Sequence, residues 1–461
     1  IILHISEEEV AFLEEAKITE LLTKYNKFMP IPIKFGMKTE TLPKPEDAKE
    51  EDAAPTKEVD NIINNPSPAW TKQPSELKDE DYSGFYRELY PMQFEEPLFN
   101  IHLNVDYPFN LTGILYFPKM NKDMQIQKDK IQLYQNQVFV TDNVEGIVPE
   151  FLTMLRGVID SPDIPLNVSR SYLQADGAVK KISSYITRKV GDKLKSLFND
   201  NREEFNAKWD DIKIVIEYGM LTEDKFFDKA QDFMLYPTVD GNYHTFAELK
   251  EKLSPSQTDK DDKLVLLYAS NKEEQHSYIA AAKDKGYEVL LLDSPIISHL
   301  IQKMETSQEK ISFARVDGDH VDNLIKKDEE AISKLSDQEK ETLKTFLTDT
   351  IPAEKFSVQL EAMDSKSNPF IITEPEFMRR MKEMQQNGGG GGMFGMGNMP
   401  DMYNLIVNTN HELVTEILNT KTAKKKERLV NQALDLAKLS KGLLKGEDMT
   451  AFINRSYEMI K

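Results

Sequence analysis

Residues 165–174 read Pro165-Leu166-Asn167-Val168-Ser169-Arg170-Ser171-Tyr172-Leu173-Gln174, a polar loop that leads into a long helix. Apolar residues follow it at helical spacing, at Val179, Ile182, Ile186, Val190, Leu194 and Leu197. A loop of this kind can direct Asn167, Arg170 and Gln174 at one anionic group. Arg170 suits phosphate because its planar fork binds two oxygens at once and stays charged. A surface ion pair is the commoner role for such an arginine, and the loop alone leaves both roles open.

The sequence around this loop resembles the signature of the middle domain of the heat-shock protein 90 chaperone family, in its bacterial type. The resemblance runs from Asp160 to Gln174 and continues upstream through residues 146–152 and 156–159. One departure is Ser171, where the family usually has glutamate. The loop therefore keeps the arginine of the signature without the carboxylate that follows it.

The resemblance implies that three side chains of the loop act on ATP. Arg170 and Gln174 would assist catalysis by contacting the terminal phosphate, and Asn167 would join Arg170 in binding the nucleotide. The ATP and its Mg²⁺ would be held by a separate N-terminal domain, so this chain would bind no cofactor alone. In agreement, no Gly-rich phosphate loop follows a strand in the sequence. The full-length protein resembles an ATPase, and we expect this chain to be a fragment that is inactive alone.

Composition narrows the possible partners. The 58 Lys and Arg residues against 78 Asp and Glu residues give a net charge of −20, which argues against nucleic acid or an anionic membrane as a partner. The chain has no cysteine, so disulfides, thiolate catalysis and cysteine zinc sites are excluded. No apolar run approaches the ~20 residues of a membrane span. The chain begins with Ile1, so its sequence does not reveal a targeting segment, and the family resemblance implies a cytoplasmic protein.

A length of 461 residues indicates several domains. The resemblance implies an α/β (α+β) multidomain fold. Its expected parts are residues 1–33, the tail of the nucleotide-binding domain with a connecting helix; 34–60, a charged linker; 61–255, the large α/β sandwich of the middle domain; 256–318, a small α/β unit; and 319–461, a mainly helical C-terminal dimerisation domain.

The first sixty residues are expected to contain a strand, a helix and a linker. Residues 1–5 are apolar enough for a strand, and Ser6 with Glu9 forms a capping-box pattern for the next helix. From Lys38 to Asp60 the chain is rich in Pro, Glu, Lys and Ala. This composition predicts a solvated, mobile linker.

Alternating apolar residues indicate strands in the large middle unit. Residues 99–105 alternate, and residues 131–140 predict a hairpin that turns near Gln135 and Asn136. Three or four such strands, followed by the helix after Arg170, predict an α/β sandwich. Residues 212–218 also look like a strand.

The chain has two tryptophans, and their surroundings differ. Trp70 lies in the proline-rich segment Pro66-Ser67-Pro68-Ala69-Trp70-Thr71-Lys72-Gln73-Pro74. It could cover core on the surface of its own domain, or it could form an exposed platform for client proteins, as the resemblance implies; we weigh the two alternatives equally. Trp209 lies on a helical pattern with Phe205 and Ile212, which predicts a core position.

Residues 264–304 alternate between strand and helix patterns, which predicts a small parallel sheet of structural role. The following segment, Asp317-Gly318-Asp319-His320-Val321-Asp322, is rich in possible metal ligands. It lacks the alternating ligands and distal glutamate of a calcium loop, so we predict a domain junction and no metal site.

A Met and Phe stripe follows Pro375 and is expected to bind clients. The residues are Phe377, Met378, Met381 and Met384, and a glycine-rich, Met-rich segment comes after them. Such stripes are usually core, but flexible methionine surfaces also adapt to many shapes. The family resemblance places a client-contacting helix here.

The last two helical patterns are expected to pair across a two-fold axis. Their apolar positions include Leu429, Ala433, Leu436, Leu439, Phe452 and Ile453. They could pack back onto the same chain, but the resemblance favours a four-helix bundle in a homodimer.

Together these features predict a fragment of an ATP-dependent chaperone that holds unfolded or partly folded clients as a dimeric clamp. Co-chaperones are possible partners. The alternative is a non-enzymatic dimeric scaffold with no nucleotide link.

Overall fold

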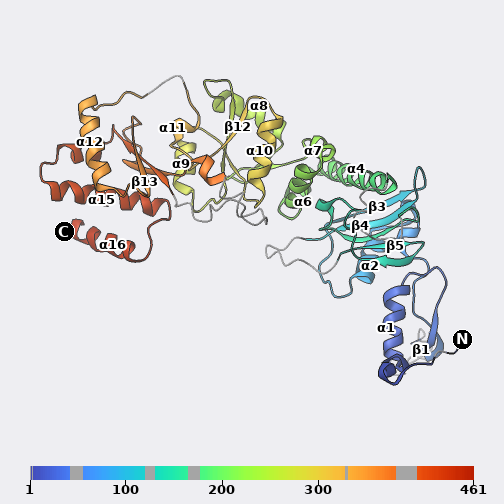
Figure 1. Ribbon diagram of the computed structural model, residues 1–461. Helices are drawn as coiled ribbons and strands as arrows, with labels where there is room; N and C mark the ends of the chain where they lie inside the picture. Colours follow the sequence, from blue (N-terminus) through green and yellow to red (C-terminus); the bar gives the residue numbers. More distant parts are fainter. Residues whose placement is uncertain are drawn as a thin grey trace, which may run out of the picture. The chain divides into compact units, whose positions relative to one another are not determined.

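The computed structural model describes residues 2, 4–41, 56–119, 130–164, 177–327, 331–380 and 402–460. The chain forms two compact units, residues 1–230 and 231–461 (Figure 1). Within the described ranges, no helix is long and apolar enough to span a membrane.

The start of the first unit differs from the prediction. Ile2, His4 and Ile5 form no strand, and a 3-10 helix η1 (Glu7–Leu13) precedes α1 (Glu15–Asn26). Ser6 makes no side-chain cap, so the predicted capping box is wrong. The interior of the predicted linker, residues 42–55, lies outside the described residues. Its two flanks are ordered, because β1 (Lys34–Thr41) pairs antiparallel with β2 (Thr56–Ile62).

A five-stranded sheet forms the centre of the first unit. Its strands are β3 (Phe99–Val105), β4 (Leu111–Phe117), β5 (Ile131–Gln135), β6 (Val138–Thr141) and β7 (Arg156–Asp160), in the order β3-β4-β7-β5-β6. The hairpin β5-β6 turns at Asn136 and Gln137, one residue beyond the predicted turn. β7 was not recognised as a strand in the sequence, yet it is the middle strand and buried along its whole length.

Helices pack on this sheet, which confirms the expected α/β sandwich. The short 3-10 helices η2 (Ala69–Thr71) and η3 (Pro74–Glu76) lead into α2 (Asp79–Leu89), whose Phe85 and Tyr86 share a core cluster with Ile114 and Tyr116 of β4. The long helix α4 (Gly177–Asp200) packs against β3 and buries Val179, Ile182 and Ile186. Figure 1 shows α2 and α4 beside the strands.

The remaining helices of the unit are α5 (Arg202–Ala207), α6 (Trp209–Thr222) and α7 (Asp224–Ala230), and η4 (Glu150–Leu152) packs on α6. The predicted strand at 212–218 is therefore wrong. Its buried residues Ile212, Val215, Ile216 and Gly219 have helical spacing, and a β-branched run fits a buried helix as well as a strand. Trp209 is buried in the core, as predicted.

The second unit begins with a small three-stranded sheet. After β8 (Tyr236–Pro237), β9 (Tyr243–His244) and α8 (Phe246–Gln257), the chain alternates through β10 (Leu264–Ala269), α9 (His276–Asp284), β11 (Val289–Leu291), α10 (Ile297–Ser307), β12 (Ile311–Arg315) and the short α11 (Val321–Leu324). The strands are parallel in the order β11-β10-β12, which confirms the predicted parallel sheet.

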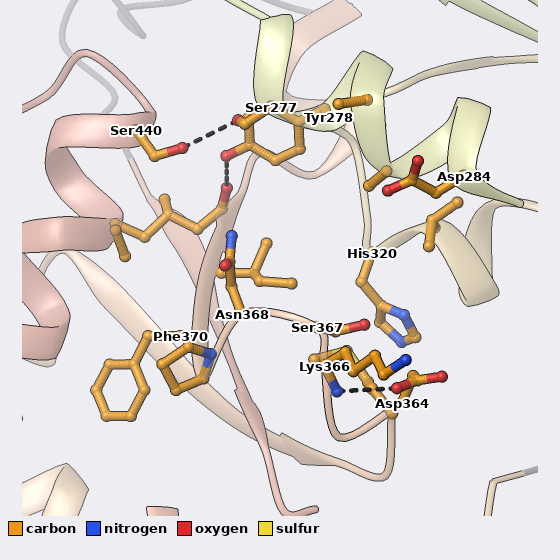
Figure 2. Close-up of a pocket in the computed structure, with 18 of the residues that line it drawn as sticks. Ser277, Tyr278, Asp284, His320, Asp364, Lys366, Ser367, Asn368, Phe370 and Ser440 are labelled. Atoms are coloured by element: carbon orange, nitrogen blue, oxygen red, sulfur yellow. Dashed lines mark hydrogen bonds between the residues drawn. The ribbon is translucent and has the colours of Figure 1, made fainter. Parts of the chain in front are cut away.

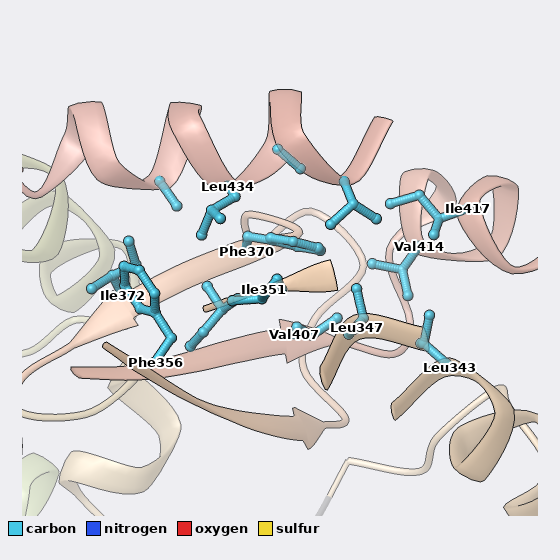
Figure 3. Packing of buried hydrophobic residues seen from close by; sticks show 14 of the residues in the cluster. Leu343, Leu347, Ile351, Phe356, Phe370, Ile372, Val407, Val414, Ile417 and Leu434 are labelled. Carbon is cyan, nitrogen blue, oxygen red and sulfur yellow. The ribbon is translucent and has the colours of Figure 1, made fainter. Parts of the chain in front are cut away.

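The C-terminal part contains a sheet that the sequence did not reveal. β13 (Phe356–Glu361), β15 (Tyr403–Asn408) and β14 (Phe370–Thr373) lie in that order, and α12 (Asp337–Thr350), α14 (Glu412–Asn419) and α15 (Ala423–Ser440) contribute to the same core (Figure 3). The helix α12 starts at a capping box of Ser336 and Glu339. α16 (Gly446–Ile460) packs on α15, and none of the residues of α16 is fully buried.

Candidate functional site

The predicted phosphate-contacting residues Asn167, Arg170 and Gln174 lie outside the described residues. The structure describes both segments that flank them. β7 ends at Asp160 in the middle of the five-stranded sheet, and the chain is described again from Gly177, the first residue of α4. The loop therefore connects the central strand of a sheet to the longest described helix, which packs on that same sheet.

Asp160 anchors the strand end that leads into the loop. Its carboxylate accepts hydrogen bonds from the backbone N–H groups of Asn136 and Gln137, both at 2.8 Å, and from the indole N–H of Trp70 at 3.3 Å. Burial raises the pKa of Asp160, and these hydrogen bonds offset part of the rise. The two backbone donors belong to the β5-β6 turn, so one carboxylate holds the hairpin, the tryptophan segment and β7 together.

Trp70 is not an exposed platform. Its side chain is fully buried, with ring centroids 4.7 Å from Phe28 and 5.2 Å from Tyr134. The prolines of its segment turn the chain so that the indole covers the sheet, which is the core-covering alternative. The expectation that Trp70 offers an exposed surface to clients is therefore corrected.

A second buried carboxylate, Asp317, joins distant parts of the C-terminal unit. It accepts hydrogen bonds from Gln275 Nε2 at 2.8 Å and pairs with Arg315 and with Lys441, and Arg315 also reaches Glu374 at 2.9 Å. Burial alone would raise the pKa of Asp317, but the two cations outweigh burial and lower it. The sequence pattern could not reveal this network, because Lys441 is 124 residues from Asp317.

The carboxylate-rich segment around Asp317 is thus occupied by cations of the protein itself. Within the described ranges, no group of three or more His, Asp or Glu side chains is arranged to hold a metal ion.

Of the four client-contacting residues predicted in the Met and Phe stripe, two are described. Phe377 is 70% exposed and Met378 is half-buried, while Met381 and Met384 lie outside the described residues. Residues 376–380 are helical and anchored, because Arg380 donates to Glu305 at 2.7 Å and Arg379 donates to the Tyr268 hydroxyl. Phe377 thus projects from a fixed turn.

The predicted dimerisation residues separate into two groups. Ala433 is buried and Leu429 packs against the core of the same unit, so this side of α15 packs back onto its own chain, which is one of the two alternatives for these helices. Leu436, Leu439 and Ile453 remain 50%, 43% and 43% exposed, and Phe452 is half-buried.

Polar contacts fix α16 antiparallel to α15. Arg428 pairs with Glu458, and Gln432 binds Ser456 at 3.0 Å. This arrangement leaves Ile453, Tyr457 and Ile460 exposed at helical spacing on α16.

Comparison with known proteins identifies the family. The sequence profile of the Hsp90 protein family matches residues 38–461. The chain is 45% identical to the chaperone protein htpG of Bacteroides fragilis strain 638R over 100% of this chain and 76% of that protein. It is 51% identical to HtpG of Bacteroides thetaiotaomicron, over 92% of this chain and 61% of that protein, and 51% identical to HtpG of Porphyromonas gingivalis strain ATCC 33277, over 91% and 60%. The chain therefore belongs to the Hsp90 protein family.

Proposed function

We propose that this chain is the client-holding body of an ATP-dependent molecular chaperone that works as a homodimeric clamp. Membership of the Hsp90 family and similarity to bacterial chaperones support the general function. The structural observation that carries the clamp is an exposed apolar face of α16, formed by Ile453, Tyr457 and Ile460 at helical spacing, with Leu439 also exposed on α15. This face is called the terminal face below.

A second copy of the chain is the proposed partner of the terminal face. Two copies related by a two-fold axis bury the same residues on both sides, and two helices from each form a four-helix bundle. The polar contacts between α15 and α16 fix the two helices as a pair, so the bundle needs little rearrangement.

The nucleotide part of the proposal concerns Arg170 and Gln174. ATP supplies the phosphoanhydride bond whose hydrolysis drives clamp opening, and the family resemblance places its binding site in a separate domain. Arg170 would neutralise charge on the terminal phosphate, with Gln174 and Asn167 beside it. The described frame supports this role, since β7 and α4 fix both ends of the loop within one packed unit.

Sedimentation velocity tests the dimer. Ile453→Asp with Tyr457→Asp should convert a dimer into a monomer, because the substitutions place charges in an apolar interface. The matched control is Asn454→Asp, at an exposed polar position of the same helix. A monomeric wild-type chain at tens of micromolar, or a double variant that still dimerises, would refute the clamp.

Client holding and hydrolysis need separate tests. The 461-residue chain should suppress the light scattering of heat-denatured citrate synthase without ATP, and Phe377→Ser should weaken this suppression, whereas Lys366→Ser at an exposed polar site should not.

In a protein that also carries the nucleotide-binding domain, Arg170→Ala should lower ATP turnover by up to about 10³-fold. Unchanged turnover would remove the assignment of Arg170.

A further inference from the structure

A cavity of about 690 Å³ lies between α9 and α15 in the second unit (Figure 2). Short side chains line it on both helices: these are Ala280 and Ala281 on α9 and Ala433 and Ala437 on α15. The two helices are bridged at one end, where the Ser277 and Ser440 hydroxyls are 3.0 Å apart. Asp284 lines the cavity two helical turns further along α9, so the cavity forms a groove that runs for about 10 Å beside this helix.

The groove contains an exposed large apolar side chain. Leu436 of α15 lines the cavity and is 50% exposed. Pro369 and Ile371 also line it, and both are partly exposed. A hollow apolar surface that is open to solvent marks a site of interaction with another molecule.

The edge of β14 at this groove already has hydrogen-bond partners. β14, which lines the cavity, is an edge strand of its sheet. The Tyr278 hydroxyl donates to the Ile372 carbonyl, and the Glu374 N–H donates to the Asp317 carbonyl at 3.1 Å. An extended peptide binds a strand edge through main-chain hydrogen bonds of this kind, whereas a helix has already paired its own backbone. The groove therefore favours a helix over an extended peptide.

The charges at the groove favour a basic partner. Asp284, Asp322 and Asp364 line it together with Lys285 and Lys366. Lys285 is paired with Asp322 at 2.7 Å, which leaves two exposed aspartates against one exposed lysine. The chain as a whole carries a net charge of −20, so its field adds to the local attraction for a cation.

We propose that this groove binds a basic amphipathic helix of a partner protein. Apolar side chains of that helix, three and four residues apart, fill the space between the alanines and cover Leu436, and its lysine or arginine side chains lie near Asp284 and Asp364. Short side chains on both walls suit the spacing of about 8–10 Å at which helices pack side by side. None of the described lining residues belongs to the terminal face, and the proposal does not rest on the ATP-dependent clamp.

The probe is the fluorescein-labelled peptide LKKLLKLLKKLLKL, whose leucines recur at helical spacing, titrated with the whole 461-residue chain by fluorescence anisotropy. The peptide LKLKLKLLKLKLKL has the same composition with alternating leucines, and LEELLELLEELLEL keeps the helical pattern with the charge reversed. Each should bind at least about ten-fold more weakly, because losing the burial of a single leucine is already worth about this factor and the acidic peptide is also repelled. Equal or tighter binding of either peptide would overturn the proposal.

A bulky substitution locates the site on the chain. Ala281→Trp fills the groove from an exposed position of α9 and should weaken binding of the basic helical peptide at least about ten-fold. The matched control is Ala247→Trp at an exposed position of α8, which should leave the affinity unchanged. The urea transition of each variant, read by far-UV circular dichroism, should match that of the wild type. Peptide binding that survives Ala281→Trp in a folded chain would refute the assignment.

A charge reversal separates the groove from general attraction to an acidic protein. Asp284→Lys should weaken binding of the basic helical peptide about three-fold or more, because it replaces an attraction at the rim by a repulsion. Asp349→Lys makes the same change in net charge at an exposed position of α12 and should leave the affinity within about two-fold of the wild type. An equal loss in both variants would show that net charge alone holds the peptide, and the groove would not be its site.

Discussion

Asp160 and Asp317 are both buried carboxylates that hold sequence-distant segments together, yet they are compensated in opposite ways. Asp160 is surrounded by neutral donors, two backbone N–H groups and an indole, and its pKa is raised. Asp317 is paired with two cations, and its pKa is lowered. The difference teaches that burial alone does not decide the charge state of a carboxylate; the charge of its partners does.

The largest effect is expected for Asp317→Asn. Removing this charge leaves Arg315 and Lys441 without their common counter-ion in a buried place, which costs about 3–5 kcal/mol of unfolding free energy. Both tryptophans of the chain lie in residues 1–230, so tryptophan fluorescence reports only the first unit. In urea titrations the far-UV circular dichroism transition of the second unit should move to lower urea, while the fluorescence transition stays. A shift in fluorescence alone would contradict this prediction.

Asp160→Asn should lower the unfolding free energy by less, and its effect should appear in tryptophan fluorescence, which reports the first unit. No cation is left unpaired, but the amide group of asparagine faces a site that supplies only donors. The expected loss is about 1–3 kcal/mol, the cost of leaving buried groups unsatisfied. The fluorescence transition should shift to lower urea, because the indole N–H of Trp70 loses its carboxylate acceptor. Stability equal to the wild type would show that the three donors find other acceptors.

Sequence reasoning found the elements with strong local patterns and missed those defined by distant contacts. The strands β10 and β11 of the parallel sheet and the helices α4, α9 and α10 were predicted because their periodicity lies within one segment, whereas β12 was not predicted. β7 was missed because its five residues, Arg156 to Asp160, begin and end with charged side chains whose hydrogen-bond partners, such as Tyr86 for Arg156 and Trp70 for Asp160, lie far away along the chain. Asp317 pairs with Lys441, and Trp70 donates a hydrogen bond to Asp160. No spacing along the chain indicates either contact.

The two carboxylates should also differ in the sign of their pH dependence. Asp317 has a lowered pKa, so its contribution is present above the ordinary value of 3.8 and is lost as pH falls below it. Asp160 has a raised pKa, so its carboxylate destabilises the fold at neutral pH, and this penalty is relieved as pH falls towards 3.8. Each slope is at most about 1.4 kcal/mol per pH unit.

Urea titrations between pH 7 and pH 3 check these signs. The difference in unfolding free energy between wild type and Asp160→Asn, read by fluorescence, should change in favour of the wild type as the pH falls from 7 to 3.8. The corresponding difference between wild type and Asp317→Asn, read by circular dichroism, should stay constant between pH 7 and 3.8 and shrink only below pH 3.8. Slopes of the same sign in both signals would remove the contrast between the two sites.

The smallest effect on the unfolding free energy is expected for Asp240, an aspartate of the second unit that is paired but exposed. Asp240 pairs with Lys283, and the two side chains are 51% and 41% exposed. Asp240→Asn should change the unfolding free energy by no more than about 1 kcal/mol, because water already solvates both charges. It keeps the substitution, the unit and the loss of one negative charge the same as in Asp317→Asn, so only burial and the number of cations differ. If its circular dichroism transition moved as far as that of Asp317→Asn, net charge rather than the buried network would set the stability of the unit.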